Sequence, residues 1–198
     1  MKRIEYYFWI NSDWAYLGAE RLEALAQRQQ AVIDYMPVDL PLVYSQTGGL
    51  LLSQRAPERQ AYREAELQRW CIRLGVAINA TPKYMCPNGD LASCMVIAAK
   101  RRGWAAGKLS QAILHAGWVA QQDISSPDTL LEVARAVCLD GDVLLAEAAT
   151  QSVRDEYLLY TNQAIAAGVF GSPSYVYRGE LFWGQDRLDF LEAALAEA

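Results

Sequence analysis

Hydrophobic positions near the start of the chain predict a strand, a helix and a second strand. Residues 4–10 form a short apolar run, residues 14–29 repeat apolar side chains at helical spacing, and residues 31–38 form a second apolar run. Pro37 and Pro41 end this second run, because proline donates no hydrogen bond to a sheet. The pattern therefore predicts a β-α-β unit.

The next hundred residues follow a helical period. Gly75, Gly103 and Gly168 each come directly after a periodic segment, which is typical of helix C-termini. The predicted helices are residues 57–74, 91–102, 108–121, a helix that opens at Ser126-Pro127, one near 142–150, and 152–167.

The end of the chain returns to alternating strands. Residues 174–177 and 181–183 predict a hairpin around Arg178-Gly179-Glu180, and residues 186–196 predict a final helix. We therefore expect an α/β fold in which a βαβ half and a ββα half share one sheet. Residues 1–45 and 168–198 would form this sheet domain, and residues 46–167 an inserted helical domain.

Composition and charge exclude several classes of protein. The 198 residues are 53% hydrophobic and 21% charged, which is typical of a folded globular protein. A net charge of -5 with dispersed Lys and Arg argues against nucleic-acid binding. No apolar run approaches the ~20 residues of a membrane span, and the N-terminal apolar stretch is too short for a signal peptide. We expect a cytoplasmic location and no membrane partner.

Cysteine and histidine give little support to metal or protein-thiol chemistry. Cys71, Cys86, Cys94 and Cys138 form no Cys-x-x-Cys pair, and a cytoplasmic setting keeps thiols reduced. His115 is the sole histidine and lies in a predicted helix, where a structural role is expected. Catalysis by a Ser-His-Asp triad or by a multi-histidine metal site is therefore difficult to assemble.

Two segments far apart in the sequence carry a recognisable motif. Residues 168–177 read Gly-Val-Phe-Gly-Ser-Pro-Ser-Tyr-Val-Tyr, and residues 181–191 read Leu-Phe-Trp-Gly-Gln-Asp-Arg-Leu-Asp-Phe-Leu. This order of parts resembles the surroundings of the active-site proline in a thioredoxin fold. At the other end, residues 6–10 lead into Ser12-Asp13-Trp14-Ala15, where a thioredoxin-type enzyme carries Cys-x-x-Cys. The redox pair is absent from this position.

Together these motifs resemble the 2-hydroxychromene-2-carboxylate isomerase family, which is related to kappa-class glutathione transferases. Weaker similarities in between are Thr47-Gly48-Gly49-Leu50, the segments 55–63 and 66–70, and Pro82-Lys83-Tyr84. The resemblance covers the full chain and implies a thioredoxin-like fold with a helical insertion. It also implies glutathione as cofactor, a small aromatic-derived substrate and a homodimer.

Ser12 opens the helix that follows the first strand. Serine is a favoured N-cap, so capping alone explains it. A helix N-terminus stabilises an anionic sulfur by roughly 0.3 to 1 kcal/mol, and a hydrogen bond to the charged sulfur adds roughly 1.5 to 3 kcal/mol. Together they lower a thiol pKa of about 8.5 by about one to three units. With no cysteine here, the sulfur must arrive on a ligand. The resemblance identifies it as glutathione, with Ser12 as the catalytic hydroxyl that donates to its thiolate.

The C-terminal motif supplies the expected glutathione contacts. X-Pro bonds are mostly trans, but the resemblance implies a cis bond between Ser172 and Pro173 that exposes the Ser172 backbone to the peptide-like backbone of glutathione. It also implies that Gln185 and Asp186, with the amides at the start of the last helix, hold the carboxylate and amine of the γ-glutamyl end. An acidic residue at a helix start also has an ordinary capping explanation.

Further positions match or depart from the family pattern. Asn88 follows Pro82-Lys83-Tyr84 as the family pattern requires, and we expect it to hydrogen-bond glutathione or substrate. Position 94, an arginine in related sequences, is a cysteine here, and Asp13 stands where related sequences have proline. Asp13 would place a negative charge beside the thiolate. Both departures bear on the family's anionic substrate rather than on the fold.

Four aromatic residues have two interpretations. Trp9, Trp14, Tyr16 and Tyr44 either line an apolar slot beside Ser12 or belong to the core.

We expect a glutathione-dependent cis-trans isomerase of 2-hydroxychromene-2-carboxylate or a related aromatic-catabolism intermediate. A kappa-type transferase or peroxidase, and a non-catalytic glutathione-binding module, are the alternatives.

Overall fold

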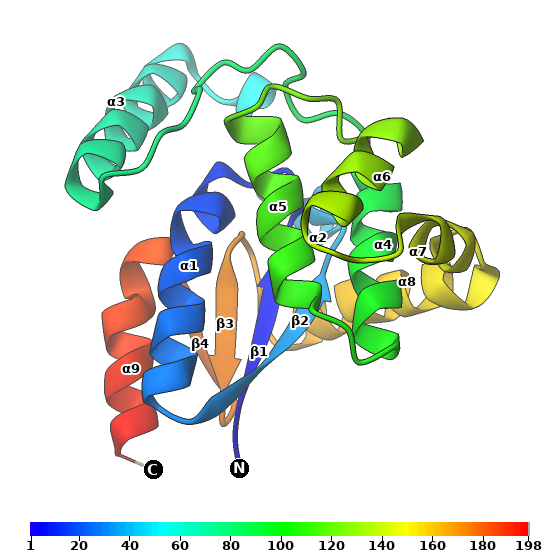
Figure 1. The fold of residues 1–198 in the computed structure, drawn as a ribbon. Coiled ribbons are helices and arrows are strands. Elements are labelled where there is room, and N and C mark those ends of the chain that lie inside the picture. The colour runs from blue at the N-terminus through cyan, green and yellow to red at the C-terminus, as the bar shows by residue number, and fades with distance from the viewer. Residues whose placement is uncertain (198) are drawn as a thin grey trace.

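A mixed sheet lies at the centre of the protein (Figure 1). The computed structural model describes residues 1–197, whose strands form one four-stranded sheet in the order β2-β1-β3-β4. The strands are β1 (Lys2–Phe8), β2 (Ala31–Pro37), β3 (Ser174–Tyr177) and β4 (Glu180–Trp183). β1 runs parallel to β2 and antiparallel to β3, and β3 and β4 form an antiparallel hairpin. The C-terminal strand β3 therefore lies beside the N-terminal strand β1.

Helices pack on both faces of this sheet. α1 (Asp13–Arg28) and α9 (Leu188–Ala196) contact each other on one face, where the Tyr35 hydroxyl of β2 donates to Glu23 of α1. Asp34 points to the opposite face, because side chains alternate along a strand. There it pairs with Arg3 and with Lys100 of α4 (Asp90–Arg101), and α8 (Gln151–Ala166) also contacts β2.

The segment between β2 and β3 is helical. Its elements are α2 (Leu40–Thr47), the 3-10 turn η1 (Leu52–Gln54), α3 (Pro57–Leu74), α4, α5 (Ala106–Trp118), α6 (Pro127–Ala136), α7 (Gly141–Ala148) and α8. α4 packs against β2 and α5 against α1. α3 is different, because it buries only Arg63 and Leu67 and projects from the body of the molecule in Figure 1.

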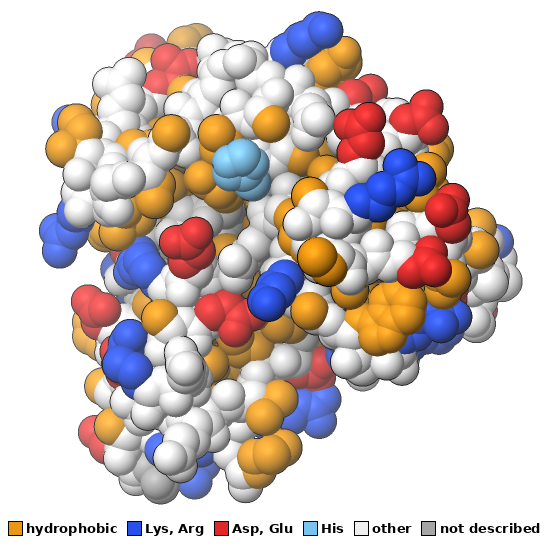
Figure 2. Space-filling model, viewed as in Figure 1, with side chains coloured by type: hydrophobic (Ala, Val, Ile, Leu, Met, Phe, Trp, Pro, Cys, Tyr) orange, Lys and Arg blue, Asp and Glu red, His pale blue; other side chains and the backbone are white. Residues whose placement is uncertain are grey.

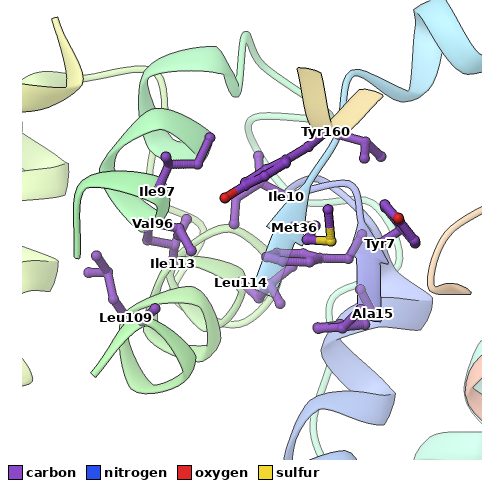
Figure 3. Close-up of a cluster of buried hydrophobic side chains, with 14 of the residues drawn as sticks. Tyr7, Ile10, Ala15, Met36, Val96, Ile97, Leu109, Ile113, Leu114 and Tyr160 are labelled. Atoms are coloured by element: carbon purple, nitrogen blue, oxygen red, sulfur yellow. The ribbon is translucent and has the colours of Figure 1, made fainter. Parts of the chain in front are cut away.

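The helical segment and the sheet share one hydrophobic core. Figure 3 shows Ile97 of α4 and Ile113 of α5 on one side of this cluster, with Tyr7 of β1 and Met36 of β2 on the other. Burial of such side chains stabilises a fold by roughly 1.5–3 kcal/mol each. The core therefore joins the two parts of the chain.

The predicted order of elements is confirmed, with four corrections. α5 spans Ala106–Trp118 instead of 108–121. β1 spans Lys2–Phe8 instead of 4–10. Trp9 and Ile10 extend the apolar run because they pack in the core after the strand has ended. α2 was not predicted from the sequence. The final helix does not begin at residue 186: a 3-10 turn, η2 (Gln185–Arg187), precedes α9.

On the face drawn in Figure 2, acidic and basic side chains are interspersed. Within residues 1–197, no helix has the length and apolarity to cross a membrane. The same residues contain no group of three or more His, Cys, Asp and Glu side chains arranged to hold a metal ion.

Candidate active site

Ser12 is the N-cap of α1 and is only 5% exposed. Its hydroxyl accepts a hydrogen bond from the Ala15 amide at 3.1 Å and donates to the Ser172 carbonyl at 3.3 Å. The start of α1 therefore meets the loop before β3, although 160 residues separate the two serines. The partial positive charge of the helix end is directed at this point.

Hydrogen bonds fix the loop that contains Ser172 and Pro173. The Ser172 hydroxyl accepts from the Trp9 amide at 2.8 Å, and the Pro173 carbonyl accepts from the Gly184 amide at 2.9 Å. The Ser172-Pro173 peptide bond is cis, as the family resemblance implied. This loop thus connects the start of α1 with the Trp-Gly-Gln-Asp segment.

Ser12 lines a central pocket, which adjoins an α3 pocket and a loop pocket. The central pocket is lined by Trp9, Asn11, Ser12, Asp13, Trp14, Leu40, Tyr44, Leu51, Leu52, Arg55, Arg63, Cys86, Trp118 and Ser172. The α3 pocket, of about 340 Å³, is lined by Trp14, Arg55, Tyr62, Glu66, Trp70, Ser172 and residues 183–187. The loop pocket, of about 700 Å³, is lined by Trp9, Asn11, Asp39, Pro41, residues 51–53, Gln60, Arg63, Glu64, Thr81 and residues 85–90.

The central pocket joins the other two. It shares Trp14, Arg55 and Ser172 with the α3 pocket. It shares a second set with the loop pocket: Trp9, Asn11, Leu51, Leu52, Arg63 and Cys86. The central pocket, of about 70 Å³, therefore lies between the two larger pockets beside Ser12.

Gln185 and Asp186 both line the α3 pocket, but they differ in charge and in exposure to solvent. Gln185 is buried, and its Oε1 accepts a hydrogen bond from Arg21 of α1. Asp186 is 41% exposed and forms an ion pair with Arg187 at 2.8 Å. Asp186 thus presents an accessible carboxylate at this end of the pocket, and the Gln185 amide lies buried beside it.

Asp13 is buried beside Ser12, but its charge is compensated. Arg63 of α3 contacts its Oδ2 through Nε at 2.7 Å and through Nη2 at 2.5 Å, and the Trp14 amide donates to Oδ1 at 2.8 Å. Burial raises the pKa of the Asp13 carboxyl, while the Arg63 guanidinium and the Trp14 amide act to lower it. The carboxylate that the sequence places beside Ser12 is therefore paired with Arg63, a cation from a distant element.

Two cysteines occupy positions of interest. Cys86 lines both the central and the loop pocket, and burial raises the pKa of its thiol to about 11. Cys94 is buried in α4 and lines none of the three pockets, and burial likewise raises its thiol pKa to about 11. Both thiols are protonated near neutral pH, which makes them weak nucleophiles.

Five of the six predicted site residues line the three pockets, in two groups, whereas Pro173 lines none of them. Ser12, Ser172, Gln185 and Asp186 line the continuous central and α3 pockets. Asn88 lies apart from them in the loop pocket, where its Oδ1 accepts from the Asp90 amide at 2.9 Å.

The aromatic residues also divide. Trp9, Trp14 and Tyr44 line the central pocket. Tyr16 instead packs its ring edge against His115 at 6.4 Å between ring centroids.

Sequence reasoning missed Arg55 and Arg63. Arg55 lines the central and α3 pockets, and Arg63 lines the central and loop pockets. Both lie in a polar segment, where an arginine ordinarily faces solvent. The resemblance included this segment but gave neither residue a role.

Comparisons with known proteins support the fold. Residues 3–196 match the model of the DSBA-like thioredoxin domain. The 2-hydroxychromene-2-carboxylate isomerase of Sphingobium xenophagum is 31% identical over 198 residues, which is 99% of both chains. The solved structure of a 2-hydroxychromene-2-carboxylate isomerase aligns with a TM-score of 0.86 at 24% identity, over 98% of this chain and 95% of the other. The cytosolic disulfide reductase DsbM of Pseudomonas aeruginosa, solved with GSH, shares the fold at 16% identity and a TM-score of 0.67, over 98% and 99% of the two chains.

The fold and the site define a thioredoxin-fold enzyme in which a serine stands in place of the redox cysteines. The chain belongs to the DSBA-like thioredoxin domain family and, within it, to the group of 2-hydroxychromene-2-carboxylate isomerases. As a member of this group, the protein is an isomerase.

Proposed function

We propose that the protein is a glutathione-dependent cis-trans isomerase of a conjugated, aromatic-derived compound. The observation that supports this most is the position of Ser12 at the start of α1, where two pockets meet. An anionic sulfur is stabilised by a helix N-terminus, and the pKa of about 11 keeps Cys86 from supplying one. The sulfur would therefore arrive on a ligand.

The residues of the α3 pocket fit glutathione. Asp186 offers a carboxylate to its ammonium group, Gln185 offers an amide, and Arg55 offers a cation to a carboxylate. Ser172 lies between this pocket and Ser12, where the middle of an extended tripeptide would pass. The DsbM structure with GSH shows that a protein of this fold binds the tripeptide.

When bound, glutathione supplies a thiolate that adds reversibly to a conjugated double bond, which becomes single, rotates and re-forms as the thiolate leaves. The Ser12 hydroxyl would donate a hydrogen bond to the sulfur, and the amides of α1 would stabilise its charge. The Asp13-Arg63 pair would hold the wall of the central pocket without adding net charge. The double bond would be presented from the loop pocket, where Asn88 offers a hydrogen bond.

The direct test combines glutathione titration with product analysis. Isomerisation of 2-hydroxychromene-2-carboxylate, the compound named for the relatives, should require glutathione and leave its concentration unchanged after many turnovers. Stoichiometric loss of glutathione would instead identify a transferase. Absence of glutathione binding would contradict the proposal altogether.

A further inference from the structure

Arg21 does not line the α3 pocket, but its guanidinium contacts two residues that do. Arg21 is half-buried on α1, and its Nη1 donates a hydrogen bond to Oε1 of Gln185. Its guanidinium carbon lies 5.9 Å from the centre of the Trp70 ring, within the range of a cation–π contact. Gln185 belongs to η2 and Trp70 to α3. One side chain of α1 therefore contacts two separate walls of the proposed glutathione site.

The backbone of α1 holds Gln185 from a second side. Gly18 approaches so closely that a Cβ atom at position 18 would lie 3.1 Å from the Gln185 Cβ and 3.0 Å from the Tyr175 hydroxyl. Gln185 is only 2% exposed, whereas the side chain of Asp186, the next residue of η2, is 41% exposed. Because these two residues are adjacent, the contacts that fix Gln185 also fix the backbone from which Asp186 reaches the pocket.

Few contacts hold the other wall of the pocket. α3 buries only Arg63 and Leu67, and Arg63 pairs with the start of α1. Trp70 is half-buried and lies nearer the C-terminal end of α3. Its contact with Arg21 ties this part of α3 to the middle of α1. The position of Trp70 relative to Gln185 therefore depends on Arg21.

Arginine suits this double contact for a physical reason. Its planar guanidinium can donate hydrogen bonds at its edge while its face lies against an aromatic ring. Within residues 1–197, the Arg21 guanidinium makes no ion pair with a carboxylate, so no such partner competes for it. Arg28 of the same helix is different, because it pairs through Nε and Nη2 with Glu192 of α9. Arg21 is thus the arginine of α1 that serves the walls of the pocket.

We infer, building on the proposed function, that Arg21 is a positioning residue for glutathione. It acts through Gln185 and Trp70, which it holds at the separation that the bound tripeptide requires. Loss of Arg21 should weaken the binding of glutathione, because the free protein would then sample other separations of the two walls. The chemistry at Ser12 should be unaffected once glutathione is bound.

The first experiment measures glutathione binding and turnover in Arg21→Met, which keeps an unbranched side chain and removes the guanidinium. The dissociation constant from titration calorimetry and the KM for glutathione should both rise about five- to tenfold, while kcat for 2-hydroxychromene-2-carboxylate stays within about twofold of its original value. Arg28→Met is the matched control, because it removes two hydrogen bonds from the same helix outside the three pockets and should change neither constant. An unchanged dissociation constant in Arg21→Met, a loss confined to kcat, or equal changes in the two variants would overturn the inference.

Two further variants separate positioning from charge. Arg21→Lys keeps the charge, but a single ammonium group cannot serve Gln185 and Trp70 together as a guanidinium does. It should bind glutathione at least about threefold more weakly than the original protein, and an original affinity would refute the positioning role, since charge alone would then suffice. In a Trp70→Leu background, the loss caused by Arg21→Met should shrink at least about twofold, because one of the two contacts is already gone. Losses that simply multiply would contradict the bridge between the walls.

Hydrogen exchange tests the same role without a ligand. Arg21→Met should accelerate amide exchange in residues 66–74 and 184–187 and leave α7 unchanged, whereas Arg28→Met should alter none of these segments. Unchanged exchange in both wall segments of Arg21→Met would refute the inference even where glutathione still binds. If the original protein binds no glutathione, the proposed function fails, and the exchange data still decide whether Arg21 holds the two walls. If Arg21→Met does not fold, Arg21→Lys is measured in the same way against Arg28→Lys.

Discussion

The Ser12 hydroxyl has two partners in the structure, and the proposed catalytic role requires it to exchange one of them. It accepts a hydrogen bond from the Ala15 amide, and this bond leaves the hydroxyl proton of Ser12 free to point in any direction. It donates to the Ser172 carbonyl over a long 3.3 Å, so a thiolate would compete for that proton. A charge-assisted hydrogen bond is roughly twice as strong as a neutral one.

Replacing Ser12 with alanine should raise the pKa of bound glutathione, because the donor to sulfur is removed while the helix end remains. Activity at pH 7 should therefore fall more than activity at pH 9. Loss of the cap should also lower the free energy of unfolding by about 1 kcal/mol. Thiolate absorbance of the bound ligand reports the titration directly, and identical curves for both proteins would refute the role of Ser12.

Ser126→Ala is the matched control for this variant. Ser126 is also an N-cap residue, but it makes no side-chain capping bond and lies outside the three pockets. It should leave the pH profile of activity unchanged.

Asp186 should matter for binding rather than for chemistry, because its proposed partner is the γ-glutamyl ammonium. Asp186→Ala should weaken glutathione binding by about 1 kcal/mol, a modest loss for a carboxylate that is partly exposed. The apparent KM for glutathione should rise about fivefold while kcat stays near its original value. Asp189→Ala, an exposed acid of α9 outside the α3 pocket, should change neither constant.

The residue level also shows the limit of prediction from sequence. The sequence could bring Ser12, Ser172, Gln185 and Asp186 together because they lie in motifs whose order follows the fold, and the structure places them around adjoining pockets. Arg63 was missed because its partner Asp13 is 50 residues away, and only the tertiary structure brings the two together. In the sequence, Arg63 resembles a solvent-facing arginine and Asp13 resembles an ordinary acidic residue at the start of a helix.

At the scale of elements, α3 depends on few contacts. It buries Arg63 and Leu67, and the ion pair of Arg63 with Asp13 ties it to the start of α1. Tyr62, Glu66 and Trp70 of the same helix line the α3 pocket. The buried pair therefore controls the position of one wall of the proposed glutathione site.

Arg63→Met should loosen α3 more than it destabilises the whole protein. Hydrogen exchange of residues 57–74 should accelerate, and glutathione affinity should fall about tenfold or more, since removal of one partner leaves Asp13 buried and unpaired. Arg69→Met is the control on the same helix, because it removes an exposed pair with Glu66 and should cost at most about 1 kcal/mol. Equal effects of the two variants would contradict the anchoring role of Arg63.

The elements themselves were largely predictable, and the exceptions have physical reasons. α3 was predicted with its observed bounds because its charged face and Gly75 define both the helix and its end. α2 was missed because Pro41 was taken only as the end of the second strand, whereas proline is also tolerated in the first turn of a helix, here one capped by Asp39. Local patterns do not distinguish these two cases.

At the scale of the molecule, the Asp34 cluster links the helical segment to the sheet. Burial acts to raise the pKa of Asp34, but Lys100 of α4 and Arg3 of β1 together outweigh it and hold the pKa below its ordinary value. The folded state thus favours the ionised carboxylate. This stabilisation is present above the unfolded pKa of about 3.9 and is lost as the pH falls through the lower folded value.

Asp34→Asn should therefore destabilise the protein by about 1–2 kcal/mol near neutral pH, because Lys100 loses its carboxylate partner. The difference from the original protein should shrink as the pH drops below about 4. Urea unfolding at several pH values measures this, and a difference that persists unchanged at pH 2–3 would contradict the assignment.

The division of the chain into a sheet domain and an insertion is also testable. α4 packs on β2 and shares its core, so residues 46–167 expressed alone should not fold stably or bind glutathione. The proposed boundary at residues 45 and 46 falls inside α2, so a fragment that begins at Gly48 is the second version to test. A cooperative thermal transition in either fragment would show an independent domain.

The place of β3 between β1 and β4 has a consequence for synthesis of the protein. Until residues 174–177 leave the ribosome, β1 can pair only with β2, and its other edge stays open. An open strand edge invites pairing with other chains, and domains normally fold as their N-terminal parts emerge first. A nascent chain stalled before residue 174 would lack Gln185 and Asp186 and would also be prone to aggregate. Quality control should therefore act on incomplete chains of this protein. A short delay in translation just before residues 174–177 should be more harmful than one in the helical segment.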